Sequence, residues 1–156
     1  YFIRKTHQVN KLHKSVLIQE KNELKYGLNL SSSYKKFAIR VKSSKKKLVT
    51  IFKKCKKNNK KIIGYGATAK SVTVLNYCGI DGSFIDYFLD TTLDKQGKYT
   101  PGTKILIKKY SGSIDKDVDY VFLGAWNFKR EILKKEMKFI KSGGKFIVHT
   151  PIPKIL

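Results

Sequence analysis

The chain has 156 residues, of which 41% are hydrophobic and 12% aromatic, and 34 basic against 11 acidic residues give a formal net charge of +23. This composition suits one folded domain with a single core rather than a disordered chain, and no apolar run reaches the roughly 18–20 residues of a membrane span. With no signal-peptide pattern, and with Cys55 and Cys78 outside any CxxC motif or His/Cys cluster, we expect a cytoplasmic, reduced protein without a membrane contact or a metal site.

Lysine dominates the charge, and most of it lies in the first part of the chain. Residues 1–61 hold nineteen basic residues against two acidic ones, for a net charge of +17, whereas residues 62–156 hold fifteen against nine, for +6. Only three basic residues are arginine, the side chain that base reading favours, and no zinc-finger, helix-turn-helix or RNP motif is present. We interpret the lysines as solvated faces, so nucleic acid is not an expected partner. Attraction of small anions and polyanion binding through residues 1–61 are the alternatives.

The first 59 residues are predicted to be helical. A helix over 15–26 is followed by Gly27, a typical helix stop, and the serines at 31–33 can cap a second helix from Tyr34 to about residue 57. Apolar or small residues of this second helix recur every three or four positions, which makes one stripe on its surface: Phe37, Val41, Ser44, Leu48, Ile51 and Cys55. We expect this stripe to pack against the following sheet, with an interface to a partner helix as the alternative.

From residue 60 onward the pattern alternates between strands and helices. Strands are predicted over 61–65, 83–89, 103–107, 119–124 and 145–149, and helices over 69–77 and 128–140. Alternating β and α segments indicate an α/β fold, a Rossmann-like parallel sheet of about five strands with helices on both faces, preceded by a helical segment. We expect strand 61–65 to be central. The predicted domains are therefore a helical lead-in with a long amphipathic helix over 1–59 and a Rossmann-like domain over 60–156.

A glycine turn lies between the first predicted strand and the first predicted helix of this domain. Gly64 and Gly66 are spaced Gly-x-Gly, and glycine lets the backbone approach a phosphate while the helix N-terminus faces the anion. The third glycine of the dinucleotide fingerprint is missing, and Ala69 stands near its place. Lys70 in the first helical turn opposes the helix dipole, which hints at an anion nearby. The alternatives are a turn with a purely structural role and a solvated lysine.

Two further groups of residues follow predicted strands and so belong to the same edge of a parallel sheet. Asp90 ends the second strand, at the position that accepts a ribose hydroxyl in nucleotide-binding βαβ units. Trp126 and Asn127 follow the fourth strand. The structural alternatives are a turn cap for Asp90, a core position for Trp126 and a helix cap for Asn127, and Glu131 suits the helix dipole without a further role.

Five ordered blocks of residues lie at the turns and element ends described above. They are Gly64-Tyr65-Gly66-Ala67-Thr68-Ala69-Lys70, Leu75 to Ile80, Lys95 to Gly102, Ala125-Trp126-Asn127-Phe128 with Glu131-Ile132, and Gly143 to Ile147 with Pro151-Ile152-Pro153. In this order and spacing the blocks resemble the C-terminal domain of sugar C-methyltransferases. The match covers roughly residues 20–153 and is dense from residue 61. Its departures from the family pattern are Thr68 and Ser71 in the first block and His149.

The resemblance implies the final third of an enzyme that methylates a carbon of a deoxysugar carried on a nucleoside diphosphate. S-adenosylmethionine would bind in a preceding methyl-donor domain, and the general base, a histidine, would lie before Tyr1. No catalytic residue is therefore assigned here, His7 and His13 included, and the isolated chain is expected to be inactive and to hold no cofactor. The substrate-binding residues that we expect are Gly64, Tyr65, Gly66, Ala67, Thr68, Lys70, Asp90, Trp126 and Asn127.

Two other readings stay open from the residues alone. The chain can be a stand-alone Rossmann-like module for another nucleotide, or a basic interaction protein that binds polyanions through residues 1–61. The first differs from the methyltransferase reading in whether a methyl-donor motif is encoded upstream. The second predicts strongly salt-dependent binding that needs no pocket.

Overall fold

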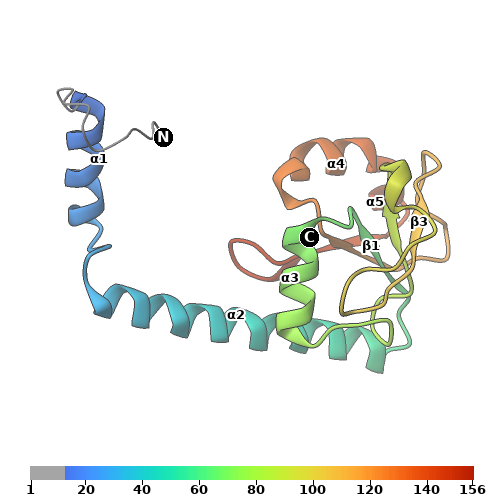
Figure 1. The fold of residues 1–156 in the computed structure, drawn as a ribbon. Helices are drawn as coiled ribbons and strands as arrows, with labels where there is room; N and C mark the ends of the chain where they lie inside the picture. The colour runs from blue at the N-terminus through green and yellow to red at the C-terminus, as the bar shows by residue number, and fades with distance from the viewer. Residues whose placement is uncertain (1–12) are drawn as a thin grey trace. The chain divides into compact units, whose positions relative to one another are not determined.

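The computed structural model describes residues 13–156, and His7 lies outside this range. The chain divides into two compact units, one that ends at Val41 and one that covers Lys42–Leu156. The ribbon in Figure 1 is coloured along the chain, and we describe each unit separately. Over residues 13–156, no helix has both the length and the apolar character needed to cross a membrane.

The first unit contains α1 (Lys14–Lys25) and the beginning of α2 (Ser31–Lys57). The His13 side chain accepts a hydrogen bond from the Ser15 N–H at the start of α1, and Gly27 adopts φ +65° two residues after its end. The predicted bounds of α1 agree with the structure to within one residue at each end. The second helix, α2, begins at Ser31, three residues before its predicted start at Tyr34. Phe37 is 57% exposed in this unit, so the first position of the predicted stripe is not buried.

The second unit is built around a six-stranded sheet with the order β3-β2-β1-β4-β5-β6. All neighbouring pairs are parallel except β5 with β6, which are antiparallel. The predicted Rossmann-like parallel sheet is thus confirmed with β1 inside it, and β6 is an edge strand that the sequence did not reveal. The strands are β1 (Ile62–Tyr65), β2 (Phe88–Asp90), β3 (Ile107–Lys109), β4 (Tyr120–Leu123), β5 (Lys145–Val148) and β6 (Lys154–Ile155).

Two strands, β2 and β3, begin later in the chain than predicted, because the residues that precede each of them form local turns instead of extended strand. The Asp81 carboxylate accepts hydrogen bonds from the N–H and hydroxyl of Ser83, which folds residues 81–85 into a turn, so β2 starts only at Phe88. A small hairpin pairs Tyr99 with Leu106 and delays β3 to Ile107. The predicted strands over 83–89 and 103–107 were therefore wrong at their N-terminal ends.

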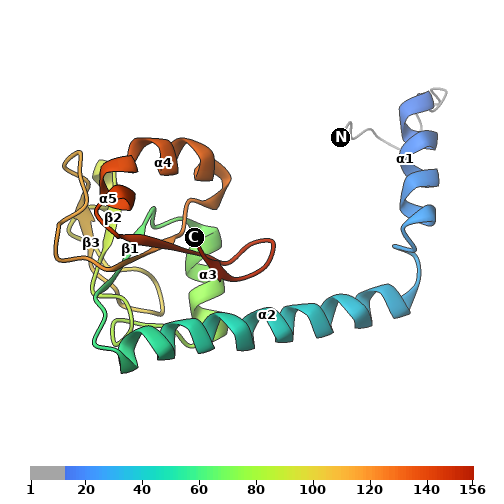
Figure 2. The ribbon, with the colours of Figure 1, turned by 180° about the vertical axis from the view of Figure 1, so that it is seen from behind.

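Helices cover both faces of the sheet, as Figures 1 and 2 show for α4 on one side and α2 on the other. Besides α2, they are α3 (Ala69–Cys78), α4 (Lys129–Lys135) and α5 (Met137–Lys141), with short 3₁₀ turns over Leu93–Lys95 and Trp126–Phe128. Successive strand residues alternate between two core clusters, as period-2 geometry requires. Ile62, Phe88, Phe122 and Ile147 belong to the cluster with α2 and α3, and Ile63, Leu89, Val121 and Phe146 to the cluster with α4 and α5.

The part of α2 that belongs to the second unit packs through Leu48, Phe52 and Cys55, all of which are buried. The predicted stripe had Ile51 in place of Phe52, and Ile51 is only partly buried. Phe52 lies edge-on to Phe84, with ring centroids 6.1 Å apart, and 5.8 Å from Phe122 of β4. This aromatic contact fixes the second half of α2 to the sheet.

We predict that Phe52→Ala lowers the free energy of unfolding by about 3–5 kcal/mol, because it removes a fully buried ring and leaves a cavity. Phe37→Ala on the same helix is the matched control. Its ring is exposed, so a change within about 0.5 kcal/mol is expected. Urea denaturation followed by circular dichroism measures both. Equal losses in the two variants would contradict the assignment of Phe52 to the core.

Candidate functional site

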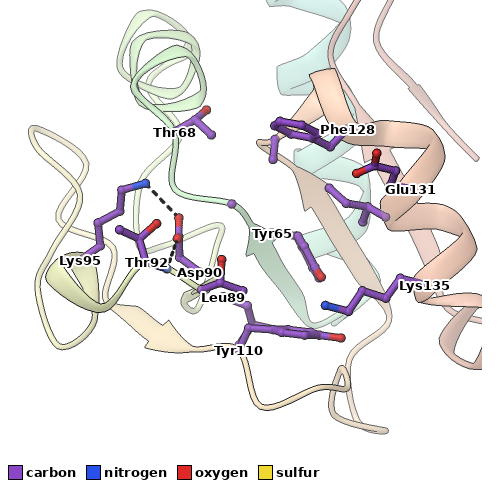
Figure 3. Close-up of a pocket in the computed structure, with 14 residues that line it drawn as sticks. Tyr65, Thr68, Leu89, Asp90, Thr92, Lys95, Tyr110, Phe128, Glu131 and Lys135 are labelled. Carbon is purple, nitrogen blue, oxygen red and sulfur yellow. Dashed lines mark hydrogen bonds and ion pairs between the residues drawn. The ribbon is translucent and has the colours of Figure 1, made fainter.

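A cleft of about 340 Å³ lies at the carboxyl edge of the sheet. The chain runs outward from β1 to β2 and β3 and then returns to β4 on the other side of β1, so the strand order reverses between β1 and β4. In open α/β sheets ligands bind at such a reversal, outside the carboxyl ends of the strands. We call this hollow the switch-point cleft (Figure 3). It is lined by Tyr65, Gly66, Thr68, Leu89, Asp90, Thr91, Thr92, Lys95, Tyr110, Ala125, Phe128, Glu131, Ile132 and Lys135.

Both glycines of the predicted turn have a packing reason to be glycine. Gly66 has φ +80°, and a Cβ there would lie 2.5 Å from the Cβ of Ala125, which follows β4. A Cβ on Gly64 would overlap the ring of Phe88. The tight-turn role that the sequence left open is therefore present, and a phosphate-binding role for these two glycines stays a prediction.

Thr68 caps α3 and also lines the cleft. Its hydroxyl oxygen accepts the Ser71 N–H at 3.1 Å, and the Ser71 hydroxyl oxygen accepts the Thr68 N–H at 3.1 Å, which makes a reciprocal capping box. The Thr68 hydroxyl also lies 3.2 Å from the Gly124 carbonyl oxygen, to which it can donate. The two departures from the family pattern in the first block thus stabilise the start of α3.

Asp90 holds the turn and its own loop in place. Its side chain is only 7% exposed. Its two oxygens accept the N–H groups of Ala67 at 2.9 Å and of Thr92 at 2.8 Å. The Lys95 ammonium adds an ion pair at 3.2 Å. Burial raises the pKa of Asp90, but the hydrogen bonds from Thr92 and Lys95 outweigh it and hold this pKa below its usual range. The turn-cap alternative for Asp90 is therefore present, and a contact to a ligand hydroxyl remains a prediction.

The remaining predicted site residues do not line the switch-point cleft. The Lys70 ammonium lies 5.5 Å from the centroid of the Trp126 ring. Trp126 and Asn127 line an adjoining hollow with Thr150 and Pro151, and this hollow shares Phe128 and Glu131 with the cleft. Gly64 is buried in β1, and Ala67 contributes only its N–H to Asp90.

The floor of the cleft holds a network that sequence reasoning missed. Glu136, only 4% exposed, accepts hydrogen bonds from the hydroxyls of Tyr65 at 3.1 Å and Tyr110 at 2.6 Å. The Lys135 ammonium lies 4.1 Å from the centroid of the Tyr110 ring. Burial, together with Glu136, raises the pKa of Tyr65 and raises that of Tyr110 to about 12, so both hydroxyls stay protonated as donors at neutral pH.

Glu136 also marks the interruption of a helix that the sequence predicted as continuous over 128–140. The residue separates α4 from α5 with φ −93° and ψ 26°. Because no charged residue is expected in a core, its role could not be read from the pattern. Thr92 and Lys95 could have been found, since they follow Asp90 at the predicted edge, whereas Tyr110 depended on the true end of β3.

His149 is a second buried polar residue, at the end of β5. It is 7% exposed, its ring centroid lies 5.4 Å from that of Phe122 and 6.4 Å from that of Trp126, and Nε2 has no hydrogen-bond partner within residues 13–156. Burial lowers the pKa of His149. The neutral ring is therefore the form that fits the folded protein.

Metal ligation has no support in the described part of the chain. Within residues 13–156, no group of three or more His, Cys, Asp or Glu side chains comes together in a way that could hold an ion. Cys55 and Cys78 are both buried and unpaired, and burial raises the pKa of each thiol.

We predict that Glu136→Leu lowers the free energy of unfolding by about 2 kcal/mol or more, because two buried tyrosine hydroxyls lose their acceptor. Glu136→Gln keeps a carbonyl oxygen at this position, so a smaller loss is expected. Chemical denaturation at pH 7 measures both variants. A Leu variant as stable as the unaltered chain would show that the network contributes nothing.

A second prediction concerns pH. Because the pKa of His149 is lowered in the folded state, its stabilising contribution is complete above the unfolded value of about 6.5 and is lost as the pH falls through the lower folded value. Unfolding free energies measured between pH 7.5 and 5.5 should therefore fall less steeply in His149→Leu than in the unaltered chain. Parallel curves for His149→Leu and the unaltered chain would refute the prediction.

Comparison with known proteins identifies the family of this chain. The C-methyltransferase NovU of Streptomyces niveus is 31% identical to it over 150 residues, which cover 96% of this chain and 35% of NovU. The chain thus spans about a third of the length of this curated relative. A family model described as the C-methyltransferase C-terminal domain matches residues 1–153. This confirms the resemblance seen in the sequence blocks, and the chain belongs to the C-methyltransferase C-terminal domain family.

Proposed function

We propose that residues 60–156 bind the nucleoside diphosphate sugar that an S-adenosylmethionine-dependent C-methyltransferase modifies. The observation that carries the proposal is the position of the switch-point cleft, between β1 and β4 at the carboxyl edge of the sheet. Its volume of about 340 Å³ lies within the usual range for small-ligand sites. Membership in the family and the name of the relative support the reaction class.

The chemistry of the cleft walls suits such a ligand. Phe128 is 60% exposed at the cleft, so its ring is available to stack on a base or a sugar, and Tyr65 and Leu89 add apolar surface. Thr68, Thr92 and Glu131 offer hydroxyl and carboxylate groups to ligand hydroxyls. Trp126 and Asn127, which the sequence assigned to the pocket wall, lie in the neighbouring hollow and are a weaker part of the proposal.

The chain spans about a third of the length of the curated relative, so an enzyme of that length has room for a separate methyl-donor domain. Within the present domain, Gly66 of the glycine turn packs against Ala125. We therefore assign S-adenosylmethionine and the transfer of the methyl group to a preceding methyl-donor domain, which would be the partner of this one. In this proposal the present domain binds and orients the sugar nucleotide.

Isothermal titration calorimetry tests the binding. Thymidine and uridine diphosphate glucose are the probes, and we expect weak but saturable binding that Phe128→Ala reduces, because a stacking surface is lost. Gly66→Val is unsuitable as a test, since its Cβ would displace Ala125 and alter the turn itself. Asn29→Ala, far from the cleft in sequence and in the first unit, should leave the affinity unchanged.

The same preparation separates the alternatives. With S-adenosylmethionine in excess, the chain alone is expected to transfer no methyl group to either probe, and turnover above background would overturn the division of roles. If duplex DNA binds more tightly than both nucleotides and Phe128→Ala does not affect it, the chain is instead a polyanion-binding protein.

A further inference from the structure

We propose that Lys95 and Lys135, from opposite walls of the switch-point cleft, bind the diphosphate of the ligand. The sequence had assigned this contact to the turn ending at Lys70. The new assignment rests on the proposed function for the class of ligand, but it concerns which residues of this chain hold the charge.

The two lysines converge on the cleft from different elements. Lys95 belongs to the 3₁₀ turn after β2, and Lys135 ends α4. Both line the cleft, and Figure 3 shows them on opposite sides of it, with Tyr65 between them and Tyr110 at the bottom of the view. A ligand that enters between β1 and β4 would therefore meet one ammonium group on each side.

Contacts with the cleft walls hold both ammonium groups in place. The Lys95 ammonium is 3.2 Å from Asp90, which itself bonds the Ala67 N–H, so this cation is fixed beside the glycine turn. The Lys135 ammonium rests over the Tyr110 ring at 4.1 Å. A cation–π contact attracts the ammonium group to the ring face, and the N–H groups that point away from the ring can still donate to an anion. Both side chains are thus partly ordered before an anion arrives, which reduces the entropy lost on binding.

The nearby acids leave Lys135 available. Four ion pairs form within residues 13–156, and Lys135 takes part in none of them. Oε1 of the neighbouring Glu136 accepts two tyrosine hydroxyls, and the Asp90 carboxylate accepts two backbone N–H groups and pairs with Lys95. Glu131, one turn earlier on α4, directs its carboxylate toward Phe128 and away from Lys135 in Figure 3. The cleft thus has a cationic end at Lys135 and an end beside Phe128 that can accept hydroxyls.

Lys70 also has a cation–π contact and takes part in none of the four ion pairs of residues 13–156, but it lies outside the cleft. Its ammonium lies 5.5 Å from the Trp126 ring, and neither side chain lines the cleft. The lysine that the sequence predicted to contact the anion, in the first helical turn after the glycines, therefore directs its charge to a different part of the surface.

Substitution of single lysines tests the assignment in the full chain. Thymidine diphosphate glucose and inorganic pyrophosphate are the probes, measured by calorimetry at 50 and 300 mM salt. Lys95→Gln and Lys135→Gln should each weaken binding of both probes about tenfold at low salt, and less at high salt because ions screen the contact. Lys134→Gln, an exposed neighbour on α4, and Lys70→Gln should each stay within about twofold of the unaltered chain.

Charge rescue guards against indirect effects. Lys95→Gln removes an ion pair of Asp90 and so can disturb the turn, whereas Lys95→Arg and Lys135→Arg keep the charge and should recover most of the affinity. If Lys70→Gln weakens binding and the two cleft variants do not, the inference is wrong while the proposed function stands. If the unaltered chain binds the sugar nucleotide no better than it binds glucose, the proposed function and the inference both fail.

Discussion

The carboxylate of Asp90 is the contact on which the carboxyl edge of this sheet depends. It joins the turn after β1 to the loop after β2, because it accepts the N–H of Ala67, 23 residues away in the chain, and within its own loop accepts the N–H of Thr92 and pairs with Lys95. A buried carboxylate without such partners would be strongly unfavourable, so the loops must close around it for the chain to fold. The glycine turn, the cap of α3 and the wall that carries Lys95 all take their positions from this closure. A group that does so much structural work has limited remaining capacity for a ligand.

The sequence predicted the architecture well because a buried parallel sheet leaves a clear pattern. The apolar runs at Ile62–Ile63 and Val121–Leu123 and the glycine pair between strand and helix located β1, β4 and α3 to within a residue or two. The helical period of α2 was also evident, but period alone could not tell that burial starts at Leu48 and that Phe37 stays exposed.

The candidate site was harder to predict, because it depends on how side chains far apart in sequence meet. Of the nine residues expected to bind substrate, Tyr65, Gly66, Thr68 and Asp90 line the cleft. Lys70 and Trp126 instead contact each other, because the first turn of α3 directs Lys70 across to the segment after β4. Tyr110, Lys135 and Glu136 come together only through the exact end of β3 and the break between α4 and α5. Neither feature has a local signal in the chain.

The outermost strands of the sheet give the abundant lysines one clear use. β3 has three residues, two of which are Lys108 and Lys109, and β6 has two, one of which is Lys154. An exposed strand end offers unpaired backbone groups to any other chain, and short length with positive charge is a common protection against such pairing. These three lysines thus discourage edge-to-edge aggregation of a sheet whose interior strands are almost entirely apolar.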